Sequence, residues 1–262
     1  GYHVVAVVTQ PDKPVGRHQE TLQPSPVKQY ALAHHLPVLQ PVKMKDADFI
    51  EELRSYKADL QVVVAFRMLP EIVWGMPRLG TFNVHAALLP HYRGAAPINW
   101  AVINGETETG VTTFFLDKDI DTGRIILQKP FAIPDTADVE YVYDGLMHLG
   151  AKIAMETIDL IASKLPEENL EKVDFTAVLN DISASQACED VELPTAPKIF
   201  KETCEINWNQ SAKKIYDFVR GLSPYPGCIE LLDIQLSGKK RMDVRSFLNG
   251  FKGIENYTFR RE

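Results

Sequence analysis

The feature that most constrains the fold is a regular alternation of strand and helix signals over the first two-thirds of the chain. Short apolar runs rich in β-branched residues predict buried strands, and the segments with helical periodicity between them predict helices. The predicted strands are residues 3–9, 38–39, 60–65, 81–85, 110–116 and 124–128, and the predicted helices are residues 25–35, 46–57, 97–104 and 138–163. This order is typical of an α/β domain in which helices cover both faces of a parallel sheet.

A different organisation follows this alternation. Residues 165–197 contain eight acidic residues and little periodicity, which indicates a linker that wraps over a surface. Residues 212–220 predict a helix, and the turn residues and short strand-like segments after it predict a small β domain. A chain of 262 residues is long enough for two cores. We therefore expect a large domain over residues 1–180, a linker over 181–204 and a C-terminal domain over 205–262.

The net charge of −7 is distributed unevenly. Residues 236–262 contain seven basic and three acidic residues, and residues 1–28 have a net charge of +1, so the middle of the chain is strongly acidic. A generic nucleic-acid coat protein would be basic overall, which excludes that class. The basic end could still face a phosphate backbone, and an ordinary solvated surface explains its residues equally well.

The cysteines and the apolar stretches indicate the cellular compartment of the protein. Cys188, Cys204 and Cys228 are widely spaced and form no CxxC pair, so we expect no disulfide framework and a reducing compartment. The longest apolar stretch, residues 60–66, is far too short to span a bilayer, and the first residues lack the basic and apolar regions of a signal peptide. The sequence therefore predicts a cytoplasmic protein with no membrane contact.

Two polar residues, Asn83 and His85, lie at the end of the strand predicted over residues 81–85. Side chains alternate along a strand, so these two point to the same face. Open α/β sheets bind ligands beyond the carboxyl ends of their strands, which makes the pair a candidate functional site. The structural alternative is that Asn83 caps the loop and His85 is a core histidine with a satisfied hydrogen bond.

Three aspartates, Asp117, Asp119 and Asp121, lie in the loop between the last two predicted strands. Asx-turn chemistry explains acidic residues in such a loop without any function. Their spacing also resembles the start of a calcium-binding loop, but the glycine at the sixth position and the distant glutamate are missing. We therefore expect no metal site.

Taken together, these segments resemble the folate-dependent formyltransferases. The resemblance rests on the run NVHAALLPHYRGAAPINWAVINGETETGVT, which contains Asn83 and His85, and on the D-T-G that begins at Asp121, 36 residues after His85. It extends over nearly the whole chain through TQPDKPVGR, LQPSPVK, VVVAFRMLP and SAKKIYDFVRGLSPYPG. It implies a Rossmann-like catalytic domain followed by a small OB-like β barrel. By the same comparison we expect the first strand of the sheet, and part of the barrel, to be missing from the sequence.

Within this family the chain is most similar to the members that act on initiator tRNA. That resemblance implies transfer of the formyl group of 10-formyltetrahydrofolate, a co-substrate, to the α-amino group of methionine on initiator tRNA, for translation initiation. Asn83 and His85 would donate hydrogen bonds to the developing oxyanion. Asp121 would hold His85 in its charged form and assist removal of a proton from the amine. No metal is needed, and we expect a monomer.

The same resemblance implies residues that contact the two substrates. The expected folate contacts are Ala87, Leu88, Leu89, Pro90, Phe66, Arg67, Met68 and Leu69, and the expected tRNA contacts are Arg17, Lys239, Lys240 and Arg241. Ala87 replaces the serine of the family's S-L-L-P run, and Arg67 replaces its usual glycine.

Three other functions account for parts of the sequence. Sugar-nucleotide formyltransferases share the N-x-H and N-G-E-T-E-T-G segments, but their loop at the catalytic aspartate tends to depart from D-T-G, which is intact at Asp121. A nucleotide-binding dehydrogenase is the general expectation from strand–helix alternation, but the chain contains no GxGxxG. A catalytically silent folate- or RNA-binding module would have lost Asn83, His85 or Asp121. The tRNA branch of the family is therefore the preferred hypothesis.

Overall fold

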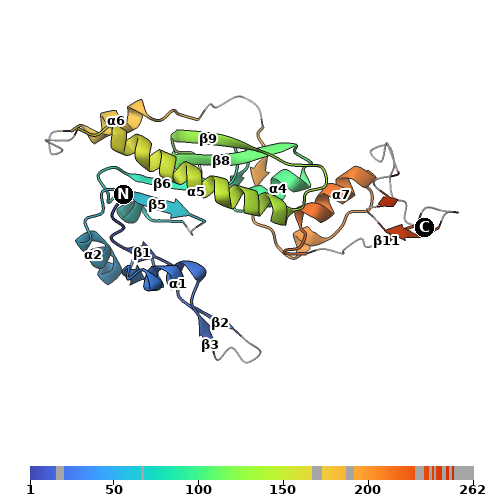
Figure 1. Cartoon of the computed structure of the whole chain (residues 1–262), viewed down its shortest axis with the longest axis horizontal. Helices are drawn as coiled ribbons and strands as arrows, with labels where there is room; N and C mark the ends of the chain where they lie inside the picture. Colours follow the sequence, from blue (N-terminus) through green and yellow to red (C-terminus); the bar gives the residue numbers. More distant parts are fainter. Residues whose placement is uncertain are drawn as a thin grey trace. The chain divides into compact units, whose positions relative to one another are not determined.

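The computed structural model divides into two compact units, Gly1–Phe82 and Asn83–Glu262 (Figure 1). The structure describes residues 1–15, 21–65, 68–166, 173–186, 192–227, 233–235, 238, 240–243, 246, 247 and 250. Four of the expected binding residues lie outside this set: Arg17, Phe66, Arg67 and Lys239.

The first unit contains the first predicted strands and helices. Strand β1 (Val7–Val8) pairs in parallel with β4 (Val38–Leu39), as the sequence predicts, although β1 is shorter than the predicted strand over 3–9. Helix α1 (Pro26–Ala33) begins with proline at its first position, and the Ser25 hydroxyl accepts from the Lys28 amide, a typical N-cap. The remaining elements of this unit are α2 (Ala47–Ser55), β5 (Gln61–Val64) and α3 (Glu71–Trp74).

A small apolar core stabilises the first unit. Helix α2 places Phe49 and Leu53 on one face, and these pack with Leu39 of β4, Met44 and Val73 of α3. The Asp46 carboxylate caps α2 by accepting from the Asp48 and Phe49 amides. The predicted helix over 46–57 is therefore confirmed, with its apolar face turned to the core.

The segment predicted as a loop over residues 10–24 contains an antiparallel hairpin, formed by β2 (Lys13–Val15) and β3 (Thr21–Gln23) (Figure 1). At its base the Lys28 ammonium donates to the Asp12 carboxylate over 2.7 Å and to the Gln40 side-chain oxygen over 2.6 Å. The hydrogen bond from Lys28 lowers the pKa of Asp12. The loop prediction was wrong. A proline removes only its own backbone N–H, and pairing of the two strands satisfies the donors and acceptors that remain.

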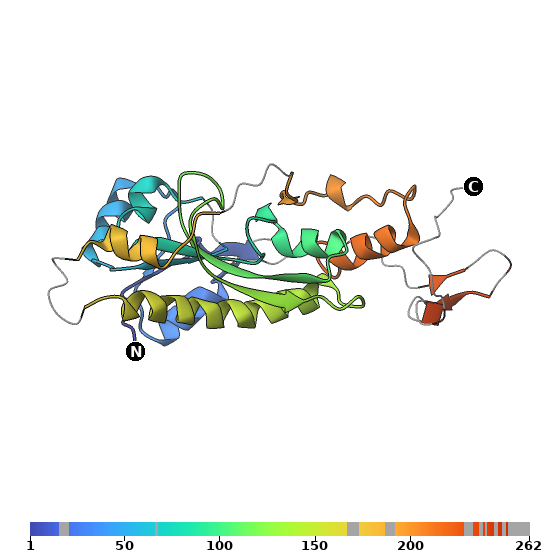
Figure 2. The same cartoon turned by 90° about the horizontal axis from the view of Figure 1, so that it is seen from above.

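The core of the second unit is a sheet in which β6 (Thr81–His85), β8 (Glu108–Phe115) and β9 (Ile125–Ala132) are neighbours in this order. Strands β8 and β9 are antiparallel, which corrects the expectation of parallel strands. The loop between them is shorter than the dozen or more residues that a parallel crossover requires. Helix α5 (Val139–Ser163) lies along one face of β8 and β9 (Figure 2).

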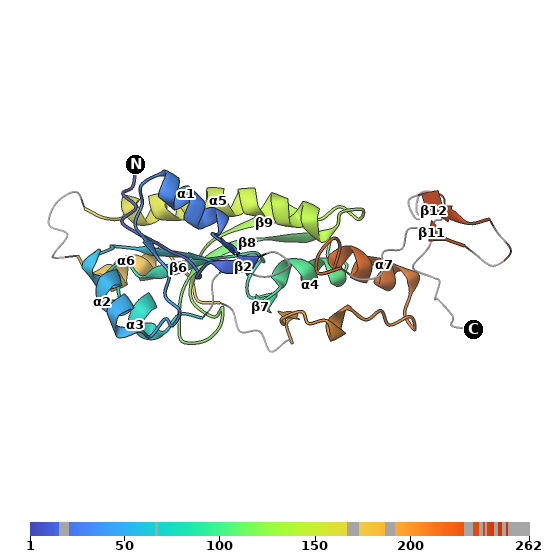
Figure 3. The same ribbon diagram turned by 90° about the horizontal axis from the view of Figure 1, so that it is seen from below.

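The opposite face of this sheet carries α4 (Pro97–Ile103), with α7 (Ala212–Gly221) packed beside it (Figures 2 and 3). Gly221 has no side chain, and a Cβ there would lie 2.5 Å from Ile103, so glycine permits the close approach of the two helices. The Asn99 amide donates to the Gly221 carbonyl, and the Trp100 indole donates to the Pro197 carbonyl. The start of the C-terminal part therefore packs firmly on α4.

The segment predicted as a linker without periodicity contains regular structure. It includes α6 (Phe175–Asp181), capped by Asp174, and β10 (Thr195–Ala196), which pairs in parallel with β7 (Arg93–Gly94). A short 3₁₀ turn, Glu202–Cys204, follows. A helix of about two turns or a two-residue strand is too short to produce a readable period, so sequence analysis missed these elements.

Beyond residue 227 the described residues contain one antiparallel pair of short strands, β11 (Asp233–Ile234) and β12 (Met242–Asp243). The described part of this region forms no closed barrel, so the structure does not establish the expected OB-like domain. None of the described helices is both long and apolar enough to cross a membrane.

Candidate active site

His85 is the last residue of β6 and is buried at 5% exposure. Its Nε2 lies 2.9 Å from the Tyr92 carbonyl oxygen. A carbonyl only accepts, so Nε2 carries the proton, and in the neutral ring Nδ1 keeps its lone pair. Nδ1 faces the Asp121 carboxylate, with 3.8 Å between Nδ1 and Oδ2. The structure therefore brings together two residues that the sequence analysis proposed as partners.

Tyr92 fixes the carbonyl that holds the imidazole. Its backbone lies in the left-handed region at φ 59°, and its phenol donates to the Glu106 carboxylate over 2.6 Å. The Asn104 amide donates to the same phenol oxygen. Burial, followed by the hydrogen bond to Glu106, raises the pKa of the Tyr92 phenol, so this group stays neutral. The Phe114 and His85 rings pack in a T-shaped arrangement, with 6.3 Å between their centroids.

Asp121 lies in the β8–β9 loop with φ 55°, a conformation that is strained for a residue other than glycine. Its Oδ2 accepts from the Gly94 amide over 2.9 Å. Two residues on, Gly123 lies so close to the Phe115 carbonyl that a Cβ would overlap it. The glycine of D-T-G is therefore required by packing, and it allows the loop to turn Asp121 toward His85.

Asn83, two residues before His85 on β6, is half-buried. Its side-chain oxygen is buried and has no hydrogen-bond partner among the described residues. Leaving a buried polar atom unpaired costs about 1–3 kcal/mol, so such an atom is a reasonable place for a ligand hydrogen bond. The amide orientation is interchangeable, so the unpaired end can serve as a donor or an acceptor.

The run from Ala87 to Pro90 follows His85 directly and is held by the neighbouring strands. The Thr112 hydroxyl donates to the Ala87 carbonyl over 2.6 Å and accepts from the Leu89 amide. The Gln128 amide donates to the Leu89 carbonyl. Ala87 is fully buried and Leu89 nearly so, whereas Leu88 and Pro90 are half-buried. Ala87 therefore fills a core position in which no hydroxyl is needed.

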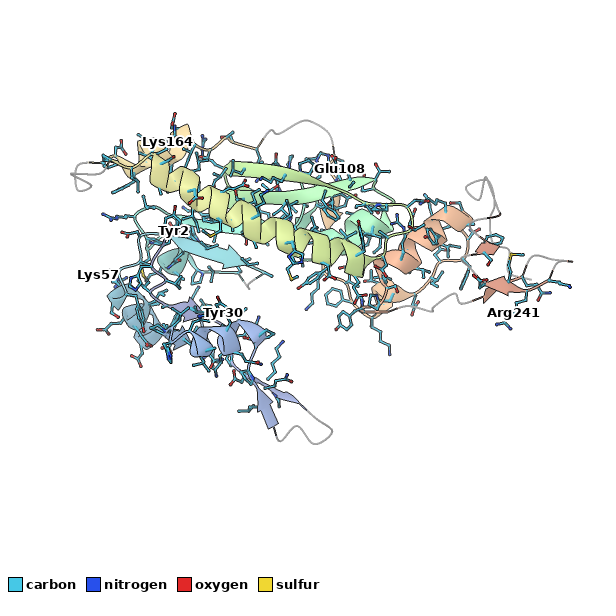
Figure 4. The ribbon with its side chains drawn as sticks, viewed as in Figure 1. Tyr2, Tyr30, Lys57, Glu108, Lys164 and Arg241 are labelled. Atoms are coloured by element: carbon cyan, nitrogen blue, oxygen red, sulfur yellow. The ribbon has the colours of Figure 1, made fainter. Side chains whose placement is uncertain are left out.

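Four other described residues that were expected to contact the substrates belong to other parts of the chain. Met68 and Leu69 belong to the first unit, where Met68 is exposed and Leu69 packs against the core around α2. Lys240 and Arg241 are exposed beside β12, and Figure 4 labels Arg241 in this terminal region.

The other two aspartates of the β8–β9 loop are exposed. The Asp117 carboxylate accepts from the Lys118 amide over 2.7 Å, which is the local turn chemistry that the sequence allowed. Among the described residues, no cluster of three or more histidine, cysteine or acidic side chains could hold a metal ion.

A segment that the sequence analysis predicted as part of a linker lies against this loop. We call residues 183–186 and 192–196 the strap. Ala184 exchanges two backbone hydrogen bonds of 2.8 Å with Ile125 at the start of β9. The Ser183 and Ser185 hydroxyls accept from the Arg124 guanidinium. Gln186 donates to the carbonyl of Asp121. No periodicity or motif marked this segment, because its contacts run from side chains to distant backbone groups.

The second half of the strap holds the loop that follows His85. The Tyr92 amide donates to the Pro194 carbonyl over 2.7 Å, and the Ala95 amide donates to the Ala196 carbonyl over 2.7 Å. Gly94 has φ 127° and lies so close to the Ala196 carbonyl that a Cβ would overlap it. The strap therefore fixes both the backbone that presents the Gly94 amide and the loop that presents Asp121.

Comparisons with known proteins agree on one family. A family model described as formyl transferase matches residues 1–158, and one described as formyl transferase, C-terminal domain, matches residues 198–230. The chain is 60% identical to a methionyl-tRNA formyltransferase of Bacteroides fragilis, over 99% of this chain and 91% of the relative. It is 51% identical to a methionyl-tRNA formyltransferase of Parabacteroides distasonis, over 98% of this chain and 91% of that protein.

Solved structures with lower sequence identity share the fold. The N-formyltransferase from Helicobacter canadensis, solved in complex with folinic acid and dTDP-3-aminofucose, aligns with a TM-score of 0.52. The alignment covers 74% of this chain and 62% of that chain, with 20% identity.

Proposed function

The chain belongs to the formyl transferase family, and we propose that it transfers a formyl group from a folate donor to the α-amino group of methionine on initiator tRNA. Relatives at 60% and 51% identity over nearly the whole chain are named for this substrate. The folinic acid in a structural neighbour supports a folate donor, and we assign 10-formyltetrahydrofolate as the co-substrate. The observation that carries the proposal is the pairing of His85 Nδ1 with Asp121 Oδ2 across 3.8 Å at the end of β6.

The reaction forms one bond and breaks one. The amine nitrogen bonds to the formyl carbon, the bond from that carbon to the donor nitrogen breaks, and one proton passes from the amine to the donor nitrogen. His85 Nδ1 is the ring atom available for this chemistry, because the Tyr92 carbonyl occupies Nε2. In the protonated ring, Nδ1–H donates to the oxyanion that develops on the formyl oxygen, a contribution of roughly 2.7–4 kcal/mol for one such donor.

Asp121 has two roles in the proposed step. At 3.8 Å its carboxylate is too far for a hydrogen bond with Nδ1 but close enough to stabilise the positive charge. The carboxylate is also a proton acceptor for the attacking ammonium, which must become neutral before it attacks. Asn83 supplies the second polar contact, through the buried amide end that has no partner among the described residues.

The placement of the folate is a further part of the proposal. Leu88 and Pro90 are the half-buried members of the run after His85, so they are the side chains available to a pterin ring. Ala87 and Leu89 hold the backbone of the run in place through Thr112 and Gln128. From the family resemblance alone, Phe66, Arg67, Met68 and Leu69 are further proposed folate contacts.

We also propose a domain organisation in which the parts of the chain have separate roles. Residues 1–180 form the catalytic domain, residues 181–204 the linker, and residues 205–262 an OB-like domain that contacts tRNA. The second family model supports a separate C-terminal domain. Arg17, Lys239, Lys240 and Arg241 are the proposed tRNA contacts, and a steep loss of tRNA affinity with salt would support them. We expect a cytoplasmic monomer.

A formylation assay tests the function. The purified chain is given 10-formyltetrahydrofolate and either methionyl-initiator tRNA or an amino-sugar nucleotide, and the formylated product is measured by mass spectrometry. We expect formyl-methionyl-tRNA and no formylated sugar. Formylation of the sugar alone would move the chain to the sugar branch of the family.

A further inference from the structure

The side chain of Gln186, in the strap, is hydrogen-bonded through both ends of its amide. Nε2 donates to the Asp121 carbonyl and to the Gly123 carbonyl, each over 2.8 Å. Oε1 accepts from the Arg93 guanidinium, over 3.1 Å from Nε and 2.5 Å from Nη2. One side chain therefore joins the loop that carries Asp121 to the residue that precedes Gly94.

These contacts act on the orientation of the Asp121 carboxylate. Asp121 has φ 55°, a strained conformation that persists only where the surroundings hold it. Gln186 holds its backbone carbonyl, and the Gly94 amide holds its Oδ2 over 2.9 Å. Because Arg93 and Gly94 are adjacent, both contacts are linked through Gln186. If Gln186 were removed, the loop could relax and turn the carboxylate away from His85.

We propose that Gln186 is a positioning residue for formyl transfer: it sets the distance and direction of Asp121 relative to His85 without touching either substrate. This inference rests on the proposed function, because it assigns Gln186 to the chemical step of that reaction. It also gives the linker a role in catalysis in addition to connecting two domains. Correct placement to within about 1 Å is worth roughly 100-fold in rate in oriented reactions.

The test compares Gln186→Met, which keeps the length of the side chain and removes both polar ends, with Gln186→Glu, which keeps only the acceptor for Arg93. We expect kcat to fall about 30- to 100-fold in both, with KM for the folate and for methionyl-tRNA within about twofold of the unchanged chain. Gln186→Glu should fall at least as far, because its carboxylate cannot donate to the Asp121 carbonyl and adds negative charge beside it.

Gln29→Met is the matched control, since Gln29 is an exposed glutamine outside the site whose side-chain amide also donates to a backbone carbonyl, that of Pro24. It should keep normal kcat. Normal kcat in Gln186→Met would overturn the inference. A melting temperature lowered in both Gln186 variants, with activity restored at low temperature, would make Gln186 structural and would also overturn it. Failure of the unchanged chain to formylate methionyl-tRNA would instead contradict the proposed function, so the two failures are distinguishable.

Discussion

Two carboxylates of the second unit, Asp121 and Asp217, are shielded from solvent and lie beside a cationic or protonatable partner, but they are held very differently. Asp217 on α7 is 5% exposed, and its Oδ1 accepts from Arg220 over 2.8 Å and from Lys213 over 2.6 Å. Arg220 also donates to the Ala137 carbonyl over 2.8 Å. Asp121 accepts one backbone hydrogen bond and faces its histidine across a gap too long for another.

The comparison separates a structural ion pair from the pair that we propose to be reactive. Asp217 accepts from two cationic side chains through Oδ1 and is packed against Gly105, where a Cβ would lie 2.7 Å from its Oδ2. Both donors lie on α7, so its contribution is to hold Lys213 and Arg220 where α7 packs on α4. Asp121 has unused acceptor capacity, a strained backbone and a partner that can change protonation state. Unfilled capacity next to a titratable ring is typical of a site that works on a ligand.

The sharpest test of the reactive side is His85→Ala. Removing the imidazole removes both the donor to the oxyanion and the cation that Asp121 stabilises, so kcat should fall about 10³- to 10⁴-fold. The free energy of unfolding should change by far less than the rise in the activation free energy that this loss of kcat represents. Steady-state formylation and urea unfolding measure the two. His148→Ala, at an exposed histidine of α5, is the control and should leave both unchanged. Near-normal activity in His85→Ala would refute the mechanism.

Asp217→Asn tests the structural side. The change keeps the shape but leaves Arg220 buried without its counter-charge, and breaking a buried pair in this way costs about 3–5 kcal/mol. Urea unfolding should show that loss, while kcat measured on the folded fraction stays near normal. Asp135→Asn removes a second partner of Lys213, but the Asp135 side chain is 73% exposed, so it should cost less than about 1 kcal/mol. Equal losses in the two variants would refute the assignment.

The sequence singled out Asp121 and passed over Asp217, for a physical reason. Asn83 and His85 share a face because strand side chains alternate, and β6 was predicted with its observed bounds. The strap and Gln186 were invisible, since a glutamine that bonds two carbonyls more than sixty residues away leaves no local pattern. The role of the Tyr92 carbonyl, which sets the tautomer of His85, likewise depends on a backbone turn.

The elements of the fold likewise differ in how well the sequence predicted them. Long periodic elements such as α5 were predicted to within one residue of their observed ends, because period and capping agree over many turns. The antiparallel direction of β9 was missed, although the short loop before it could have indicated it. The β2–β3 hairpin was missed because Pro14 disfavours a strand assignment. Short elements held by non-local pairing were the ones that sequence reasoning could not supply.

Gly105→Ala probes how tightly Asp217 is enclosed. Gly105 and Gly238 both have positive φ, at 74° and 73°, so alanine is strained at either by about 1–2 kcal/mol. Only at Gly105 does the new Cβ meet the Asp217 carboxylate; at Gly238 no atom of the described residues lies within 4 Å. Gly105→Ala should therefore cost about 1–2 kcal/mol more than Gly238→Ala in urea unfolding. Equal losses of unfolding free energy in the two variants would mean that the Asp217 side chain moves easily to accommodate the new Cβ.

The smallest expected effect is the pH dependence of the Lys213 contacts. Burial alone would lower the pKa of Lys213, but hydrogen bonds to Asp135 and Asp217 outweigh it and raise the pKa. A raised pKa in the folded state means that the stabilisation is fully present below the unfolded value of about 10.4 and is lost as pH rises through the folded value. The half-exposed position limits the contribution to about 0.5–1 kcal/mol.

This dependence is measured as the difference in unfolding free energy between the unchanged lysine and Lys213→Met, from pH 7 to pH 11.5. Both are made in a Tyr216→Phe background, because burial raises the pKa of the Tyr216 phenol, which otherwise titrates in the same range. The difference should stay constant to about pH 10 and then shrink. Lys214→Met, at the exposed neighbouring position, should give a smaller difference. If the Lys213 difference grew above pH 10, the raised pKa of Lys213 would be wrong, and Lys213 could not be a cation that pairs with Asp217.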